Sequence, residues 1–194
     1  MNLVEPTHIA VSVLAIALAL TIAQTQQLPY DFWIFASFFV IFLLTVGIGF
    51  ILHELAHKYV AIRYGAQATY RAWPFGLGFM LLISIFGMVF AAPGAVYVFS
   101  PYLTRRENGI ISLAGPMTNL ALAFLFYAGA ISFGGTLGNI LGFGASVNLF
   151  LGFFNMLPIP PLDGSKVLSW SFSMWLSFLV AMFGFSIISG VPII

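Results

Sequence analysis

The sequence has no cysteine and very little charge. Its 194 residues include six Lys or Arg and five Asp or Glu, so charged residues make up only 6% of the chain. A soluble domain carries roughly a quarter charged residues, and this chain therefore cannot cover a water-facing surface. The absence of cysteine excludes disulfides and thiolate chemistry, and a net charge of +1 gives no basic field for nucleic acid. Apolar residues make up 61% of the chain, which indicates an integral membrane protein.

Six apolar stretches approach the length of about 20 residues that a helix needs to cross a membrane. They lie at residues 9–24, 33–57, 75–99, 109–131, 140–157 and 168–189. Together they fill about two-thirds of the chain, which leaves no room for a separate soluble domain. We therefore expect a single transmembrane domain over residues 1–194.

The basic residues predict the orientation in the membrane. They follow the second and third stretches and precede the sixth: Lys58, Arg63, Arg71, Arg105, Arg106 and Lys166. Cytoplasmic segments are enriched in Lys and Arg, so these segments and the N-terminus are predicted to be cytoplasmic. Because Arg71 and Arg105 then flank the third stretch on the same side, that stretch should enter and leave the membrane on one side.

Glycine and proline interrupt the third stretch, and its last part, residues 95–99, is rich in residues that favour strands. We therefore expect a re-entrant segment containing a strand near residues 75–108. The expected fold is an all-α polytopic membrane protein with about five to six transmembrane helices. Five spans are favoured, because a sixth would place Arg105 and Arg106 outside.

Three ionisable residues stand together at the end of the second stretch, in His53-Glu54-Leu55-Ala56-His57. Ionisable groups in a membrane segment are costly and mark a functional site by default. Residues four apart share a helix face, so both imidazoles can bind one metal ion, and Glu54 lies where it can take a proton from water. The alternative is a pair of helix-end histidines bonded to neighbours, with Glu54 paired to Lys58.

A zinc hydrolase needs a third protein ligand. Four candidates lie near a chain end, at an external turn or beside arginines: Glu5, His8, Asp31 and Glu107. Asp163 remains, at the end of a segment whose three prolines forbid a continuous helix. We expect this segment to run extended near the cytoplasmic boundary, where His57 is also expected, with Gly164 permitting the turn that follows. An exposed Asp-Gly turn is the alternative.

A third motif, Ala114-Gly115-Pro116-Met117-Thr118-Asn119, lies between these two segments. Together with Ile51-Leu52-His53-Glu54-Leu55-Ala56-His57 and the Asn-x-x-Pro-x-Pro-x-Leu-Asp-Gly block at 155–164, it resembles the site-2 protease family of intramembrane zinc metalloproteases. The resemblance covers residues 34–170, the expected core, with flanking helices at 1–32 and 168–194.

The resemblance implies one Zn²⁺ per chain, held by His53, His57 and Asp163, with Glu54 as the catalytic base. It also implies that Asn119 and Asn155 line the site and help to hold the substrate or the oxyanion. Alternatively, Asn119 makes an interhelical hydrogen bond, which is worth about 0.6–2 kcal/mol.

These features predict a multi-pass protein of the cell membrane that hydrolyses peptide bonds in or near the transmembrane segments of single-span substrates, as in regulated intramembrane proteolysis. Many members of the family carry a PDZ or CBS-pair module, which 194 residues do not accommodate, so we expect any regulatory partner in trans. The alternative is a metal-ion or proton transporter that uses the His/Glu/Asp cluster as an intramembrane site. Transporters usually have repeated halves, and the sequence has no second His-Glu-x-x-His.

Overall fold

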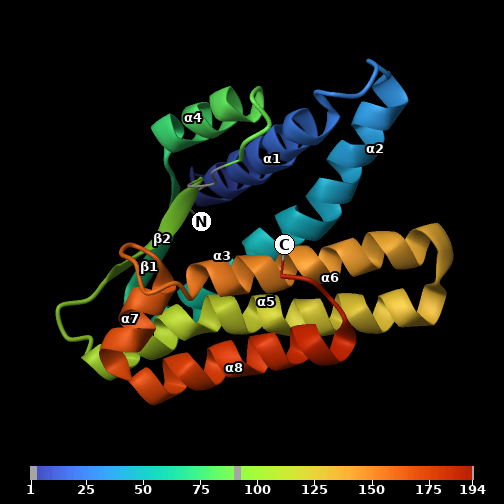
Figure 1. Ribbon diagram of the computed structural model, residues 1–194. Coiled ribbons are helices and arrows are strands. Elements are labelled where there is room, and N and C mark those ends of the chain that lie inside the picture. Colours follow the sequence, from blue (N-terminus) through green and yellow to red (C-terminus); the bar gives the residue numbers. More distant parts are fainter. Residues whose placement is uncertain (1–3, 90–92, 194) are drawn as a thin grey trace. The chain divides into compact units, whose positions relative to one another are not determined.

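The computed structural model describes residues 4–89 and 93–193, which form two compact units (Figure 1). Unit 1 takes in Met1–Ile51 and Thr69–Tyr97, and unit 2 takes in Leu52–Ala68 and Val98–Ile194. Every residue that the sequence proposes for the site lies in unit 2.

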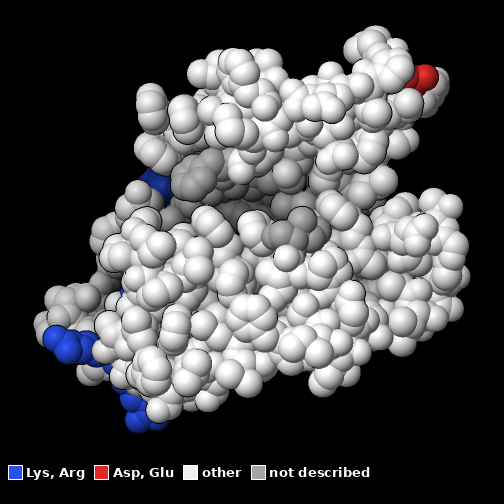
Figure 2. Space-filling view, viewed as in Figure 1, with Lys and Arg blue, Asp and Glu red and all other residues white. Residues whose placement is uncertain are grey.

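Five helices in the described residues are long and apolar enough to cross a membrane. They are α1 (Val4–Thr25), the continuous helix Phe32–Arg63, α5 (Arg105–Phe133), α6 (Gly135–Asn155) and α8 (Phe172–Ser189). The second of these consists of α2 (Phe32–Phe42), the π-helical turn η1 (Leu43–Gly47) and α3 (Ile48–Arg63). Figure 2 shows a face almost without charged residues, as contact with lipid requires. The prediction of an all-α polytopic membrane protein is confirmed, and the helices agree with five spans.

The described residues of the third apolar stretch contain no helix long enough to span the membrane. It contains α4 (Pro74–Ser84) and the strand β2 (Gly94–Phe99). The 11 residues of α4 reach about 16 Å, against a hydrocarbon core of about 30 Å. Pro74 suits the first turn of α4 because no intrahelical partner exists there for the N–H that proline lacks. The strand predicted at residues 95–99 is confirmed by β2.

The partner of β2 is β1 (Gln67–Ala72), which lies before the segment 75–108 in which strand structure was expected. In β1, polar residues at odd positions alternate with apolar residues at even positions, and this is the period of a strand. The alternation lasts only six residues, too short to identify a strand without knowledge of its partner.

Side chains of α1 hydrogen-bond to β1 within unit 1. The Tyr70 N–H donates to Glu5 Oε1 at 2.9 Å, and the Ala72 N–H donates to His8 Nδ1 at 3.3 Å. The Tyr70 hydroxyl donates to Ser12 Oγ at 2.8 Å. The three α1 residues share a helix face because they are spaced by three and four positions. Glu5 and His8, which the sequence placed near a chain end, thus satisfy backbone donors of a strand.

Two other acids that the sequence set aside as metal ligands are helix caps. Asp31 precedes α2, and its Oδ1 accepts from the N–H groups of Trp33 at 2.7 Å and Ile34 at 3.1 Å. Glu107 forms a capping box at the start of α5, where its Oε2 accepts from the Thr104 N–H at 2.8 Å. Such caps satisfy backbone donors that have no partner within the helix.

Unit 2 is built on a hairpin of α5 and α6, joined at Gly134 (Figure 1). Gly134 and Gly135 have φ angles of +59° and +55°, which glycine adopts without strain, so the chain reverses within a very short connection. The short helix α7 (Asp163–Trp170) packs against α5, and α8 contacts both α6 and α7. Their shared core consists of Ala123, Ala145, Leu149, Met156, Val167, Phe178, Met182, Phe185 and Val191.

Candidate metal centre

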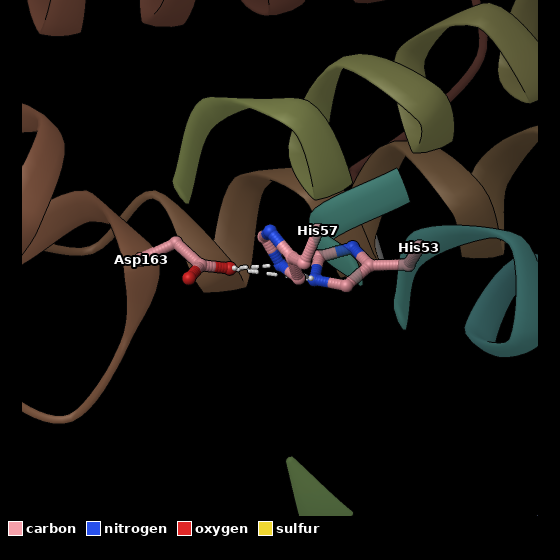
Figure 3. Close-up of side chains that lie close together, drawn as sticks. All are labelled: His53, His57 and Asp163. Carbon is pink, nitrogen blue, oxygen red and sulfur yellow. Dashed lines mark hydrogen bonds and ion pairs between the residues drawn. The ribbon is translucent and has the colours of Figure 1, made fainter. Parts of the chain in front are cut away.

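Two successive turns of α3 carry His53 and His57, and α7 begins at Asp163 (Figure 3). Asp163 Oδ2 lies 3.3 Å from His53 Nε2 and 3.0 Å from His57 Nε2, and the two Nε2 atoms lie 3.0 Å apart. All three residues are buried. A search of the described residues identifies this group of side chains as one that could hold a metal ion.

The three distances suit a zinc ion. Zinc binds imidazole nitrogen and carboxylate oxygen at about 2.0–2.2 Å with tetrahedral geometry, which separates neighbouring ligand atoms by about 3.3 Å. The observed separations of 3.0 to 3.3 Å are close to that value. Three protein ligands also leave the fourth position of a tetrahedron for water or substrate, as hydrolytic zinc sites require.

The hydrogen bonds of the two rings support the same conclusion. His57 Nδ1 lies 2.7 Å from the carbonyl oxygen of Ile111, and because a carbonyl only accepts, Nδ1 carries the proton. His53 Nδ1 faces Oδ1 of Asn119 at 2.5 Å, which requires a proton on Nδ1 in the same way. In neutral rings, both Nε2 atoms then turn lone pairs toward the Asp163 carboxylate. Three such acceptors repel one another unless a metal ion, or a proton on one Nε2, lies between them.

Gly115 keeps the space between the histidines open. A Cβ atom built on Gly115 would lie 2.5 Å from His53 Nε2 and closer still to His57 Nε2. These separations are nearer to a zinc–nitrogen bond of about 2.0–2.1 Å than to a van der Waals contact of about 3.5 Å. A side chain at this position would therefore crowd the two ring nitrogens that face Asp163. The sequence identified Gly115 only as part of a small-residue motif, because its neighbours across the helix pair are far away in the chain.

Asp163 is an anionic group in this site. Its second oxygen, Oδ1, lies 3.7 Å from Lys166 Nζ, one turn further along α7. The nearby ammonium of Lys166 favours the ionised form of Asp163, which can offer the centre a negative charge.

The segment before Asp163 differs from the predicted extended run. Residues 156–162 form turns and bends, and α7 starts directly at Asp163. Gly164 lies inside α7, where a Cβ would come within 2.6 Å of the Leu157 carbonyl oxygen, so glycine permits a close approach here. Trp175 of α8 fixes the end of α6, because its Nε1–H donates to the Met156 carbonyl at 2.8 Å. The prolines end α6 as predicted, but packing against α7 folds the segment back.

The remaining predicted residues lie around this group. Glu54 is buried on α3 between the two histidines in sequence. Asn119 is fully buried, and its Nδ2 donates to Asn148 Oδ1 on α6 at 3.0 Å, so it makes the interhelical hydrogen bond named above as the alternative. Asn155 is half-buried at the end of α6 and donates to the Leu151 carbonyl of its own helix at 2.9 Å.

Asn148 was not identified from the sequence, although it gives the signal that drew attention to Asn119. Both are amides within long apolar helices, and both are fully buried. Asn148 stands outside the three motifs, and only the pairing of α5 with α6 shows that it reaches the surroundings of the histidines.

The centre thus has the composition of a hydrolytic zinc site of the His-Glu-x-x-His class. Comparison with known proteins extends this result, because residues 41–139 and 134–188 match the family model of Peptidase family M50. The chain therefore belongs to Peptidase family M50, the site-2 protease family. Zinc is the metal named for its relatives.

Three of these relatives are named as candidate zinc metalloproteases. MJ0611 of Methanocaldococcus jannaschii is 49% identical over 175 residues, which cover 88% of this chain and 86% of the relative. YwhC of Bacillus subtilis is 30% identical over 147 residues, which cover 64% of this chain and 66% of the relative. Rip2 of Mycolicibacterium smegmatis is 33% identical over 132 residues, 58% of this chain and 50% of the relative. No solved structure matches the chain.

Proposed function

We propose that this protein is a zinc-dependent endopeptidase that cleaves membrane-protein substrates in or near their transmembrane segments. The observation that carries the proposal is the convergence of His53, His57 and Asp163 within 3.3 Å of one another in a chain with five candidate spans. These three residues would hold the ion. When bound, zinc supplies a Lewis acid that lowers the pKa of water and polarises the scissile carbonyl.

Glu54 is the proposed general base. It takes a proton from the attacking water and delivers it to the leaving amine, which splits the peptide bond into a carboxylate and an amine. His53 and His57 keep their own Nδ1 protons and donate them to Asn119 Oδ1 and the Ile111 carbonyl. With the ion on Nε2 both rings would be neutral ligands that do not compete for the proton of the water. The hydrogen bonds of Asn119 favour a role in orienting His53 and not a direct contact with the oxyanion. Asn155 remains a proposed substrate contact.

The position of the site along its helix supports cleavage within the membrane. At about 1.5 Å per residue, His53 lies about 30 Å from Phe32 and about 15 Å from Arg63 along the same candidate span. A substrate helix at this depth has its amides bonded internally, so it must unwind locally before water can attack. We therefore propose that one bond of a single-span protein is cleaved after local unwinding, with any regulatory partner supplied in trans.

Removal of the metal tests the proposed activity. Purified protein in detergent, incubated with a panel of labelled single-span peptides, should lose cleavage on treatment with a zinc chelator and regain it when Zn²⁺ is restored, because the chemistry needs the Lewis acid. The peptide fragments are measured by mass spectrometry. Stoichiometric zinc without cleavage of any peptide would favour the transporter alternative, which a zinc-flux assay in liposomes would then examine.

The proposed orientation has its own test, because the chain has no cysteine. Tyr102 precedes α5 and is 88% exposed, and Thr136 is exposed beyond the other end of that helix. In intact cells, a membrane-impermeant thiol reagent should label Thr136→Cys and leave Tyr102→Cys unlabelled until the cells are opened, as the positive-inside rule requires. The reverse labelling pattern would overturn the cytoplasmic assignment of the site.

A further inference from the structure

A chain of buried amides leads away from the proposed metal ligand His53. His53 Nδ1 faces Asn119 Oδ1, Asn119 Nδ2 donates to Asn148 Oδ1 at 3.0 Å, and Asn148 Nδ2 donates to the Gly144 carbonyl at 2.9 Å. Asn119 and Asn148 are each 0% exposed. The chain crosses from α3 to α5 and then to α6, so it links His53 to the backbone of a third helix.

We propose that Asn148 is a positioning residue, which acts through Asn119 to hold His53 in the tautomer that binds metal. The inference rests on the proposed function, since it assumes that His53 Nε2 is a metal ligand. No motif of the sequence contains Asn148, and its side chain reaches His53 only through the amide of Asn119.

The direction of every hydrogen bond in the chain follows from its last member. The Gly144 carbonyl can only accept, so Asn148 must turn its NH₂ group toward Gly144 and its Oδ1 toward Asn119. Asn119 must then turn its own NH₂ group toward Asn148 and its Oδ1 toward His53. An amide side chain can present either end to a neighbour, and Asn148 decides which end of Asn119 meets the histidine.

The direction of these hydrogen bonds determines which ring nitrogen of His53 carries the proton. An acceptor opposite Nδ1 requires the proton on Nδ1, which leaves the lone pair of Nε2 for the metal. If Asn148 no longer accepted, Asn119 could rotate and present its NH₂ group to His53. The ring would then favour a proton on Nε2, where it would have to be displaced before metal could bind.

A comparison with His57 shows why only His53 needs a second residue to fix its hydrogen-bond acceptor. Its Nδ1 donates to a backbone carbonyl, that of Ile111, which cannot turn round to become a donor. The acceptor for His53 is instead a side chain that can rotate, and so it needs a second residue to fix it. The structure therefore assigns Asn148 the role of fixing the acceptor that faces His53. For His57 the acceptor is already fixed, because it belongs to the Ile111 backbone.

The test measures zinc affinity by competition with a chelator, using the full-length protein in detergent. Asn148→Leu keeps the approximate volume and removes the acceptor, and we expect zinc affinity to fall about tenfold, within the range of about 10 to 100-fold found for residues that support metal ligands. Asn148→Asp preserves this pattern in its protonated form, because the O–H can donate to Gly144 while the other oxygen accepts from Asn119, so its affinity should stay close to that of the wild type. Ser146→Ala is the matched control, because it removes another buried polar group from α6 outside the amide chain.

A double-variant cycle separates positioning from packing. If Asn148 acts through Asn119, then Asn148→Leu should not reduce zinc affinity further in an Asn119→Leu background. Additive losses would overturn the inference. Because the chain has only three histidines, ¹⁵N-histidine labelling can also report the tautomer of His53 in metal-free protein. We expect the Nδ1–H form in the wild type and an increased Nε2–H form in Asn148→Leu.

These readouts distinguish the two levels of the proposal. A wild-type protein that binds no zinc would contradict the proposed function, while the tautomer of His53 would still test the amide chain. Normal zinc affinity in Asn148→Leu, together with an unchanged His53 tautomer, would overturn the inference and leave the proposed function intact. If Asn148→Leu does not fold, Asn119→Asp provides the second variant. It keeps an acceptor toward His53 without help from Asn148, so it should bind zinc normally, and a large loss of affinity would contradict the inference.

Discussion

Replacement of Glu54 by glutamine is expected to abolish cleavage while zinc stays bound. Glutamine has nearly the same size and retains hydrogen-bonding groups, but it cannot take up the proton that the attacking water must lose. General acid–base groups contribute about 10²- to 10⁴-fold to rates, so cleavage of a single-span peptide should fall by about that factor. Zinc content measured by mass spectrometry should remain one ion per chain, because the proposed ligands are His53, His57 and Asp163.

Glu107→Gln provides the matched control for Glu54→Gln. It makes the same chemical change at a capping-box glutamate, where glutamine also serves, and it should cleave at the wild-type rate. Glu54→Gln protein that cleaved as fast as the control would remove Glu54 from the reaction. Loss of zinc in Glu54→Gln would instead show that Glu54 is needed to hold the ion. An inactive variant that keeps its zinc could also trap a bound substrate for identification.

The local part of the site could be predicted from the sequence because helix geometry alone determines it. His53 and His57 are four residues apart, and any helix over this segment places them on one face. Asp163 was found in another way, since charge is so scarce in this chain that few acids compete for the role. The structure brings these three side chains together, although α7 begins 100 residues after α3 ends. The choice of a third ligand was limited by the small number of acids in the chain and not by distance along the sequence.

The features that the sequence did not reveal all depend on packing between distant helices. Gly115 faces the histidines because α5 passes close to α3, and no property of a glycine within an apolar helix reports that approach. Asn148 becomes informative only once its hydrogen bond to Asn119 is known. The strand β1 depends on pairing with β2 and on the side chains of α1. In each case the local sequence gave only a weak indication of the structure, and contacts with residues far away in the chain determined it.

The scarcity of charge has a second consequence for how the site is held. Few charged residues are available to orient the ligands, so neutral groups do so: a backbone carbonyl for His57 and an amide for His53. Neutral donors and acceptors cost less to bury than ions do. An apolar chain can therefore orient a metal site without introducing further charges into the membrane, and buried asparagines in its helices are the residues to examine first.

Replacement of Gly115 by alanine is expected to weaken zinc binding and, with it, cleavage. The added methyl group would lie 2.5 Å from His53 Nε2 and would crowd both ring nitrogens that are proposed to hold the ion. Relief of the overlap requires α5 or the histidines to move, and such overpacking costs about 1–3 kcal/mol. We therefore expect zinc affinity to fall by about 5- to 150-fold in chelator competition, with cleavage reduced at zinc concentrations that only just saturate the wild type.

The matched control for Gly115→Ala is Gly142→Ala, which also adds a methyl group to a long helix of unit 2. There the new Cβ meets only the Ala130 Cβ, at 3.9 Å, an ordinary contact. Alanine is favoured over glycine within a helix by up to about 1 kcal/mol, so Gly142→Ala should unfold at a temperature equal to or above that of the wild type and bind zinc normally. Because the intrinsic helix effect favours alanine at both positions, a loss of zinc confined to Gly115→Ala can arise only from the space that the methyl group occupies. Equal zinc affinity in the two variants would show that the ion does not lie against Gly115, and the proposed coordination by His53 and His57 would then have to be abandoned.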